Sequence, residues 1–477
     1  MKKFISLILV CMLILGLCAC QGSENGGAKY EGLQVGFSRQ SITPTQQGVQ
    51  IAGGDASSRL STGFMDEVAS TCIAIQKGED LFLIFTMDFM VLNQGSVDSV
   101  KPVISQATGV PQDRILLNCT HTHSGVNILS ESWDGGTAYR QLVAKRSAEA
   151  ATEAIADLSP AEIQIASCNT EGLAFVRHYL MNDGTTCGNG HGSTASGYKE
   201  HMYDAANELQ AIRFVRAAED KKDILMLSFP AHATTVNGTN ATLLSACWPG
   251  ATRAYVESNS EVHCAVFQGA SGDQVPDSKI DGLSAARKDH KKYGQILGDY
   301  VLGLEYAPVA GDQVVMKTWD YTGKSMKEGT EDLDLVSKAQ EISTLAGQKG
   351  SSDPAVGTLV AKYGFTSVYE ATGLISRVSA PETRTMTLNV LQLGSDAAMV
   401  FAPYEMFGMH GEAIKAGSDF SMDFIVTCSE VYQGYFPHIQ GCEEGFYEYD
   451  VTKFERGTGE KLAEIYAQAL NELKNAG

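Results

Sequence analysis

The sequence is poor in basic residues, with 36 Lys and Arg against 56 Asp and Glu and a formal net charge of -20. A surface of this sign repels phosphate groups, which argues against a nucleic-acid partner. The sequence also has no Cys-x-x-Cys pair, which argues against a structural zinc knuckle or a thioredoxin-like redox site. After the first 20 residues it has no uncharged apolar run near the roughly 20 residues that a membrane-spanning helix needs.

The sequence does have enough apolar residues for a large core, because 44% of its 477 residues are apolar. Strand-like and helix-like segments alternate along most of the chain. This alternation predicts an α/β fold in which a mixed β-sheet core is flanked by helices. The predicted strands are Thr71–Ile75, Leu81–Thr86, Arg114–Cys119, Glu162–Ala166, Leu209–Val215, Ile224–Phe229, His263–Phe267, Thr383–Leu393, Ala398–Ala402 and Phe424–Thr427, and the predicted helices are Val97–Thr108, Ala138–Leu158, Pro249–Ser258, Lys291–Leu304 and Gly459–Asn475.

The N-terminal segment has the pattern of an export signal: two lysines, a short apolar run, and Leu-Cys-Ala-Cys ending at Cys20. This ending resembles a bacterial lipobox, which predicts a signal peptide over residues 1–19 and a lipid on Cys20. The alternative is an ordinary secretory signal. Residues 20–29 are rich in Gly, Ser and Asn and read as a flexible tether. We therefore expect a folded domain over residues 30–477, held by its lipid at the outer face of the bacterial cell membrane.

Two segments differ in composition from the rest. Asp183–Ser196 is dense in Gly, Ser, Thr and Asn, which predicts a long loop that is either functional or disordered. Lys324–Asp353 is polar and charged with helical propensity, which predicts a cap or an insertion. Of eleven cysteines, eight follow the N-terminal segment, and several of these lie in apolar strands where a buried thiol is the simpler interpretation. Export would permit disulfides, but the sequence assigns no pairs.

Polar side chains follow several predicted strands at the point where each strand ends. His121 and His123 follow one strand, His232 follows another, and Asp273 and Glu405 follow two more. Ligands of α/β proteins bind at strand ends, so these side chains are candidates for a common polar site. A His-x-His pair alone is a weak signal for metal, because one of its histidines can serve only to satisfy local hydrogen bonds.

Short motifs in this order resemble those of the neutral, non-lysosomal ceramidase family. The first is Cys-Thr-His-Thr-His-Ser-Gly, similar to the family's Gly-Thr-His-Thr-His-Ser-Gly signature. The others are Phe-Pro-Ala-His, Gly-Asp-Gln-Val-Pro, Pro-Tyr-Glu, Gly-Tyr and Tyr-Glu. The six motifs occupy Cys119–Gly125, Phe229–His232, Gly272–Pro276, Pro403–Glu405, Gly434–Tyr435 and Tyr447–Glu448. With their flanks they span about residues 30–450, so the resemblance implies a divergent ceramidase-like catalytic domain over residues 30–477.

The resemblance implies a catalytic Zn²⁺ held by His121, His232, Glu405 and Tyr435. Two imidazoles and a carboxylate are a common set for catalytic zinc, and such an ion lowers the pKa of bound water to about 7. The tyrosine is a less usual ligand, and its alternative role is that of a packed aromatic ring.

The resemblance also implies catalytic roles beside the metal. Arg177 and Tyr447 are candidates to stabilise an oxyanion, and their alternative roles are a solvated surface arginine and a core tyrosine. His123, Asp88 and Asp273 are candidates to orient ligands or accept a proton. The implied activity is a zinc-dependent hydrolase that cleaves an amide or ester bond of a small or lipid-like substrate.

Three departures from the family pattern put ceramide itself in doubt. Val275 stands where the family has a serine, which closes any serine-dependent route and leaves a route through metal-activated water. Cys247 stands where relatives often carry an acid. The third departure is the lack of the C-terminal immunoglobulin-like domain of full ceramidases. The main hypothesis is therefore a hydrolase whose substrate is not specified. The alternatives are a true ceramidase or lipid amidase, and a catalytically inactive ligand-binding lipoprotein.

Overall fold

The computed structural model describes residues 31–53, 59–131, 133–188, 196–280, 289–440 and 445–476. The predicted signal peptide, the lipid-bearing Cys20 and the tether lie outside these residues, as does Cys442. Gly32–Gly477 form one compact unit. Within the described residues, no helix is long and apolar enough to cross a membrane.

The largest element is a nine-stranded mixed sheet. Its strands run in the order β14-β12-β11-β6-β1-β3-β4-β5, with β16 beside β6. Neighbours are antiparallel except for the parallel pairs β12–β14 and β4–β5. The strands are β1 (Leu33–Ser41), β3 (Ala69–Lys77), β4 (Asp80–Met87), β5 (Ile115–Cys119), β6 (Ser159–Asn169), β11 (Glu208–Arg216), β12 (Asp223–Phe229), β14 (Val262–Gln268) and β16 (Ala307–Pro308).

A second, four-stranded sheet has the order β17-β18-β19-β21, and β19 and β21 are parallel. Its strands are β17 (Val314–Lys324), β18 (Thr383–Leu393), β19 (Ala397–Phe401) and β21 (Met422–Val426). The two sheets pack face to face through a shared apolar core, in which Phe214, Met226 and Phe267 of the first sheet meet Leu391, Met399 and Phe424 of the second. Apolar residues on the inner faces of both sheets thus bury each other.

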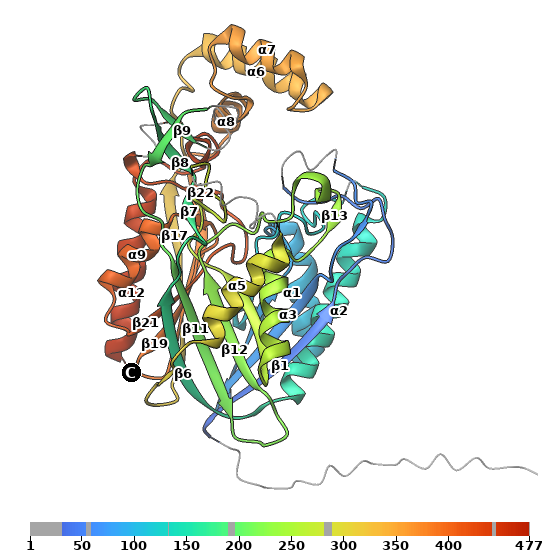
Figure 1. Ribbon diagram of the computed structural model, residues 1–477, viewed down its shortest axis with the longest axis vertical. Helices are drawn as coiled ribbons and strands as arrows, with labels where there is room; N and C mark the ends of the chain where they lie inside the picture. The colour runs from blue at the N-terminus through green and yellow to red at the C-terminus, as the bar shows by residue number, and fades with distance from the viewer. Residues whose placement is uncertain are drawn as a thin grey trace, which may run out of the picture. The chain divides into compact units, whose positions relative to one another are not determined.

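Helices cover the outer faces of both sheets (Figure 1). On the nine-stranded sheet, α1 and α2 close one apolar core and α3 and α5 close another. On the four-stranded sheet, α9 and α12 flank the strands. These helices are α1 (Gln94–Thr108), α2 (Gly136–Ala156), α3 (Cys247–Asn259), α5 (His290–Leu302), α9 (Gly408–Gly417) and α12 (Thr458–Ala476), and two short 3-10 turns are η1 (Gln112–Arg114) and η2 (Gly238–Asn240).

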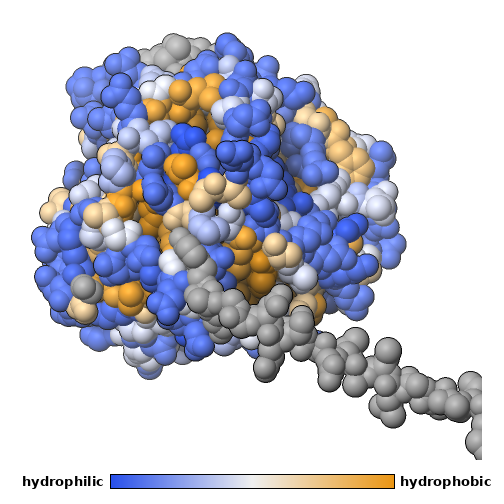
Figure 2. All heavy atoms as spheres, turned by 90° about the horizontal axis from the view of Figure 1, so that it is seen from below, coloured by the Kyte–Doolittle hydropathy of each residue, from blue (hydrophilic) through white to orange (hydrophobic). Residues whose placement is uncertain are grey.

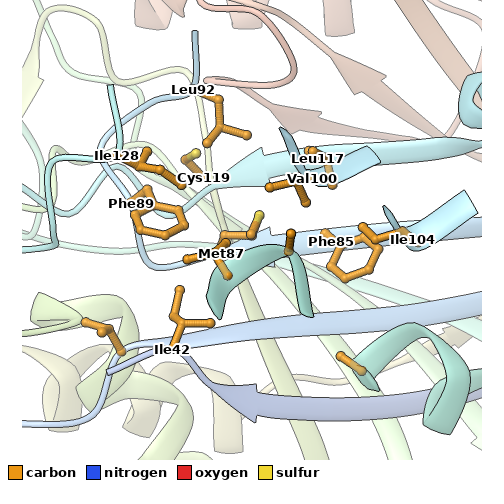
Figure 3. Close-up of a cluster of buried hydrophobic side chains, with 14 of the residues drawn as sticks. Ile42, Phe85, Met87, Phe89, Leu92, Val100, Ile104, Leu117, Cys119 and Ile128 are labelled. Atoms are coloured by element: carbon orange, nitrogen blue, oxygen red, sulfur yellow. The ribbon is translucent and has the colours of Figure 1, made fainter. Parts of the chain in front are cut away.

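The core under α1 illustrates why these segments fold together (Figure 3). Val100 and Ile104 lie one turn apart on α1 and face Phe85 and Leu117, which come from the neighbouring strands β4 and β5. All four side chains are fully buried. Burying a side chain of this size contributes about 1.5–3 kcal/mol, so this contact fixes the edge of the sheet that ends at Cys119.

Short strand pairs shape the region beyond the strand ends. The pair β20 (Glu405–Met406) and β22 (Tyr435–Phe436) is parallel, and β15 (Gln274–Val275) pairs with β7 (Phe175–Val176) in antiparallel fashion. The remaining short strands are β2 (Gly63–Phe64), β8 (His178–Met181), β9 (Thr186–Gly188), β10 (Tyr198–His201) and β13 (Leu243–Leu244). A short helix in the same region, α11 (Tyr447–Asp450), follows β22.

A helical insertion joins β17 to β18. It contains α6 (Leu333–Lys349), α7 (Pro354–Tyr363) and α8 (Val368–Val378), which lie beyond the ends of the strands in Figure 1. β17 and β18 are paired up to Lys324 and Thr383, and the amide of Ser325 donates to the carbonyl of Glu382 at 3.0 Å. The insertion therefore leaves from the open end of a β-hairpin.

The predicted α/β fold with a mixed sheet flanked by helices is confirmed, with the addition that the strands form two packed sheets. Helices are also confirmed where the sequence predicted a cap or insertion. The predicted loop Asp183–Ser196 is wrong for Thr186–Gly188, which form β9 of the small sheet β10-β8-β9; residues 189–195 lie outside the described residues.

Six of the described cysteines are free thiols, in agreement with the simpler interpretation; they are Cys72, Cys119, Cys168, Cys247, Cys264 and Cys428. Figure 2 shows the end of the molecule that is lowest in Figure 1. Where grey residues do not cover it, apolar side chains reach this face in several separate groups between polar ones.

Candidate metal centre

His121 lies in the turn that follows β5. Its backbone is in the left-handed region with a φ of 59°, a conformation that a residue with a Cβ rarely adopts. The Nδ1 atom lies 2.9 Å from the carbonyl oxygen of Met90 and 3.4 Å from the thiol of Cys428. A carbonyl only accepts, so Nδ1 carries the ring proton and donates it to Met90. The lone pair of the neutral ring is then on Nε2.

His232 follows β12 and is oriented in the same way. Its Nδ1 lies 2.7 Å from the carbonyl of Ser271 and 3.0 Å from that of Gln274. Both partners are acceptors, so Nδ1 again carries the proton and Nε2 holds the lone pair. Burial and the nearby charge of Arg177 lower the pKa of His232 to about 4, which keeps this ring neutral at pH 7.

Glu405 lies between the two histidines. Its Oε2 is 3.2 Å from Nε2 of His121 and 3.0 Å from Nε2 of His232. Its Oε1 accepts a hydrogen bond from the Tyr432 hydroxyl at 2.6 Å. Among the described residues, no donor has acceptable hydrogen-bond geometry to Oε2, although this atom is buried. A buried carboxylate oxygen without a donor is costly, so a positive partner at this atom would be stabilising.

Tyr435 is held opposite Glu405 because the two residues are paired across β20 and β22. Its hydroxyl lies 3.4 Å from Nε2 of His232. Burial and the charge of Glu405 raise the pKa of this phenol well above its ordinary value. The phenol is therefore neutral unless a cation lies beside it, in which case the phenolate is favoured.

His123 completes a group of three histidines whose ligand atoms lie within 4.8 Å of one another. Its Nε2 is 3.2 Å from Nε2 of His121. Burial and the neighbouring His121 lower its pKa well below the ordinary value. His123 is thus close enough either to donate to His121 or to serve as a further ligand.

The chemistry of these side chains fits a divalent metal. Two imidazole nitrogens lie within 3.2 Å of one carboxylate oxygen, and a phenol and a third imidazole lie beside them. Zn²⁺ takes this mixture of nitrogen and oxygen ligands. The alternative positive charge is a proton: Cys428 and Glu405 overcome the effect of burial and raise the pKa of His121 well above its ordinary value.

Arg177 is fully buried and points at the same cluster. Its Nη1 lies 3.3 Å from Nε2 of His232, and its Nη2 donates to the carbonyl of Gly272 at 2.8 Å. Its remaining donors bind Oε1 of Glu448, at 2.6 Å from Nε and 2.5 Å from Nη2. The other oxygen of Glu448 lies 3.0 Å from Nε2 of His178. Burial would raise the pKa of Glu448, but Arg177 and His178 outweigh it and lower the pKa to about 2.

Tyr447 lies farther out and is partly exposed. Its ring is 5.6 Å from the ring of Tyr435 and 4.9 Å from that of Tyr369 in the helical insertion. Burial and the charge of Glu405 raise the pKa of Tyr447 above its ordinary value, so its hydroxyl can donate at neutral pH.

The two aspartates act at a distance from the cluster. Asp88 forms a buried ion pair with Arg253, at 2.6 Å between Oδ2 and Nη2, and accepts from the Thr120 hydroxyl at 3.2 Å. Asp273 accepts from the Gly408 amide at 2.8 Å and the Tyr203 hydroxyl at 3.0 Å. Each carboxylate therefore holds a turn next to a candidate ligand.

The structure also accounts for the two unusual residues. Val275 is buried and pairs through its backbone with Phe175, which places Arg177 two residues further along. Cys247 is a buried free thiol 3.0 Å from the Thr235 hydroxyl. Neither residue offers a nucleophile to the cluster: valine has no polar atom, and burial raises the pKa of Cys247.

Sequence reasoning missed four residues that contact the candidate ligands or Arg177. They are Met90, Cys428, Tyr432 and Glu448. Glu448 had a usable signal, since it is the acid of the Tyr-Glu motif beside Tyr447. The other three act through a backbone carbonyl, a thiol and a loop hydroxyl, and no sequence pattern distinguishes these.

No protein-family model and no curated protein matches the sequence. Solved structures do match the fold. The crystal structure of neutral ceramidase from Pseudomonas aeruginosa has a TM-score of 0.69 at 15% identity, over 94% of this chain and 75% of that one. A ceramidase complexed with C2 has a TM-score of 0.65 at 15% identity, with the same coverage. The chain has a neutral ceramidase-like fold. The resemblance predicted from the motifs is thus confirmed for the fold.

Proposed function

We propose that this ceramidase-like protein is a zinc-dependent hydrolase that cleaves an amide or ester bond. In the proposed reaction the oxygen of water bonds to the carbonyl carbon, the bond from that carbon to nitrogen or oxygen breaks, and the leaving atom takes a proton. The proposed ligands are His121, His232, Glu405 and Tyr435. When bound, zinc would supply a Lewis acid and a water of lowered pKa.

One observation carries this proposal: Oε2 of Glu405 is buried without a hydrogen-bond donor and lies within 3.2 Å of two imidazole nitrogens. A cation at that point would satisfy the carboxylate and both imidazoles together.

The chain's own residues supply the remaining functions. Met90, Ser271 and Gln274 fix both histidine rings through their carbonyls, as outer partners of metal ligands do. The Nη1 of Arg177 faces the cluster and can stabilise negative charge on the carbonyl oxygen. The hydroxyl of Tyr447 is the second proposed donor, and His123 is the proposed proton acceptor.

The test is a metal assay combined with a hydrolysis screen. We expect about one zinc per chain in the wild type, and loss of zinc in both His121→Ala and His232→Ala. A screen of N-acyl amides and esters should show turnover that a chelator abolishes and added zinc restores. Full metal retention in both variants would refute the ligand set.

The same screen separates the two rival functions. Release of fatty acid from ceramide would identify a true ceramidase or lipid amidase. A metal-free protein that binds an acyl amide without turnover would identify an inactive binding lipoprotein, for which Val275, Cys247 and a proton shared by His121 and Glu405 are the supporting features.

The lipid anchor is a separate proposal that rests on the sequence alone. A lipid on Cys20 would hold the protein at the outer face of the cell membrane. Labelling with a fatty acid and fractionation of the cells test it: Cys20→Ser should lose the label and leave the membrane fraction.

A further inference from the structure

The helical insertion has a small core of its own. The helices α6, α7 and α8 bury apolar side chains against one another rather than against the sheets. This core consists of Ala339, Ile342, Ala346, Val356, Val360, Phe365, Ala371 and Leu374. The insertion is therefore a separate packing unit that meets the rest of the domain through a limited set of contacts.

The contacts from α8 are made with α11. The Ser367 hydroxyl donates to Asp450 at 3.3 Å, and Nη2 of Arg377 donates to the carbonyl of Tyr449 at 2.9 Å. A Cβ on Gly373 would lie 2.1 Å from the carbonyl oxygen of Asp450, so only glycine permits this approach. Because α11 begins at Tyr447, the insertion is seated on the helix that carries two residues of the candidate site.

Four aromatic rings run in a file from the candidate metal centre into the insertion. The ring of His232 lies parallel to that of Tyr435 at 6.5 Å, Tyr435 meets Tyr447 edge-on at 5.6 Å, and Tyr447 meets Tyr369 edge-on at 4.9 Å. The first two side chains are buried, whereas Tyr447 and Tyr369 are partly exposed. The file thus leads from the buried centre toward solvent.

We propose that Tyr369 is a specificity-determining residue that contacts the apolar substituent of the substrate. This inference rests on the proposed function and adds a substrate class to it: amides whose acyl or alkyl chain is long enough to reach past Tyr447. Aromatic faces give a large apolar contact at little entropic cost. A chain extending outward from a carbonyl at the centre would lie along Tyr447 and then Tyr369.

The test compares acyl chains of different length on the full zinc-loaded protein. In Tyr369→Ala we expect kcat/KM for a long-chain N-acyl amide to fall by about 10-fold or more, while the value for the N-acetyl amide stays within about twofold. Tyr369→Phe should behave as the wild type, because the ring and not the hydroxyl makes the contact.

A matched control is Tyr363→Ala. Tyr363 is also a partly exposed tyrosine of the insertion, but its hydroxyl binds Glu341 rather than facing the file. This variant should leave the chain-length preference unchanged. Equal losses for short and long chains in Tyr369→Ala, or no loss at all, would overturn the inference.

Failure of the proposed function would look different. If the wild type cleaves no amide or ester, the dissociation constant of a fluorescent long-chain acyl amide still tests the inference. Weaker binding of the long-chain probe by Tyr369→Ala, with unchanged binding of a short-chain probe, would support it. Equal binding of the long-chain probe by wild type and variant would overturn it.

Discussion

The inner and outer halves of the candidate site are built in different ways. In the inner half, His121, His232 and Glu405 are buried, and backbone carbonyls or a neighbouring strand fix each of them. In the outer half, Tyr447 and Tyr369 are partly exposed and come from a short helix and an insertion. The inner half is therefore suited to hold one geometry, and the outer half can change its side chains without disturbing the candidate ligands.

Backbone conformation sharpens this difference. Among the described residues, four that are not glycine have a positive φ: His121, Cys247, Cys428 and Glu430. His121 is a candidate ligand, and Cys428 contacts its ring. Left-handed backbone at a residue with a Cβ costs on the order of 1 kcal/mol or more and persists only where surrounding structure enforces it. The inner half thus contains strain that we find nowhere among Tyr447, Tyr369 and their neighbours.

The largest expected effect is at the inner half. We expect His232→Ala to lose its zinc and to lower kcat by about 10³-fold or more, because the other ligands cannot hold the ion in place. Elemental analysis and a hydrolysis assay measure the two quantities. His290→Asn is the matched control, since His290 is buried against Asp66 at 3.0 Å and belongs to α5. A His232→Ala protein with full activity would show that the inner half does not hold a catalytic metal.

The next effect concerns the scaffold of the inner half. Arg253→Met leaves Asp88 buried without its partner, and losing one member of a buried pair costs about 3 kcal/mol. Chemical denaturation should show this loss, together with weaker zinc binding, because Asp88 also holds Thr120 beside His121. Arg146→Met removes an exposed pair with Glu149 and should cost less than about 1 kcal/mol.

Glu448 tests the boundary between the two halves. Glu448→Gln should lower kcat by about 10- to 100-fold while zinc content is unchanged, because the amide can no longer hold Arg177 by two charged contacts. Glu328→Gln is the control, since Glu328 pairs with Arg456 on the surface at 2.7 Å. If Glu448→Gln also loses zinc, Glu448 belongs to the inner half, and the boundary between the halves lies farther from the candidate ligands than we infer.

The smallest effect on hydrolysis is expected outside both halves, at Asp423, where the change is one of stability. Burial raises the pKa of Asp423 to about 7 in the folded protein, against about 3.9 in an unfolded chain. The folded state therefore binds more protons between these values, and stability falls as the pH rises from about 4 to 7. Relative to Asp423→Asn, the wild type should lose up to about 4 kcal/mol of unfolding free energy over this range, since one pKa unit corresponds to about 1.4 kcal/mol. Thermal melts of the wild type and Asp423→Asn at several pH values measure this loss. If the melting temperatures of the two proteins change equally with pH, the prediction is wrong.

The residues of the inner half could be proposed from the sequence because their signals are local. His121 and His232 directly follow apolar strands, and Glu405 follows a third. The tight contacts among them depend on strand order, which the order of the motifs implied but did not determine. The partnership of Arg177 with Glu448 joins residues 271 apart, and nothing in either local pattern specifies it.

The fold shows the same limit. The strands β5, β12 and β19 were predicted nearly to their ends, since apolar runs define them. The strands β1 and β17 were missed, because polar residues interrupt their apolar pattern. The division into two sheets could not be predicted either: a strand's sequence records that a face is buried and not which strand covers it.

The hydrogen bond between Ser325 and Glu382 has a consequence for engineering. Since these residues close the β17–β18 hairpin, the 56 residues between them (382 − 325 − 1) could be excised and replaced by a two-residue turn without altering the register of the sheet. A shortened protein of this kind would lack the insertion whose Tyr369 contacts Tyr447 beside the candidate metal centre. Other helical segments whose two ends lie about as far apart could then be inserted at the same hairpin. The hairpin is therefore a suitable position for engineering substrate preference.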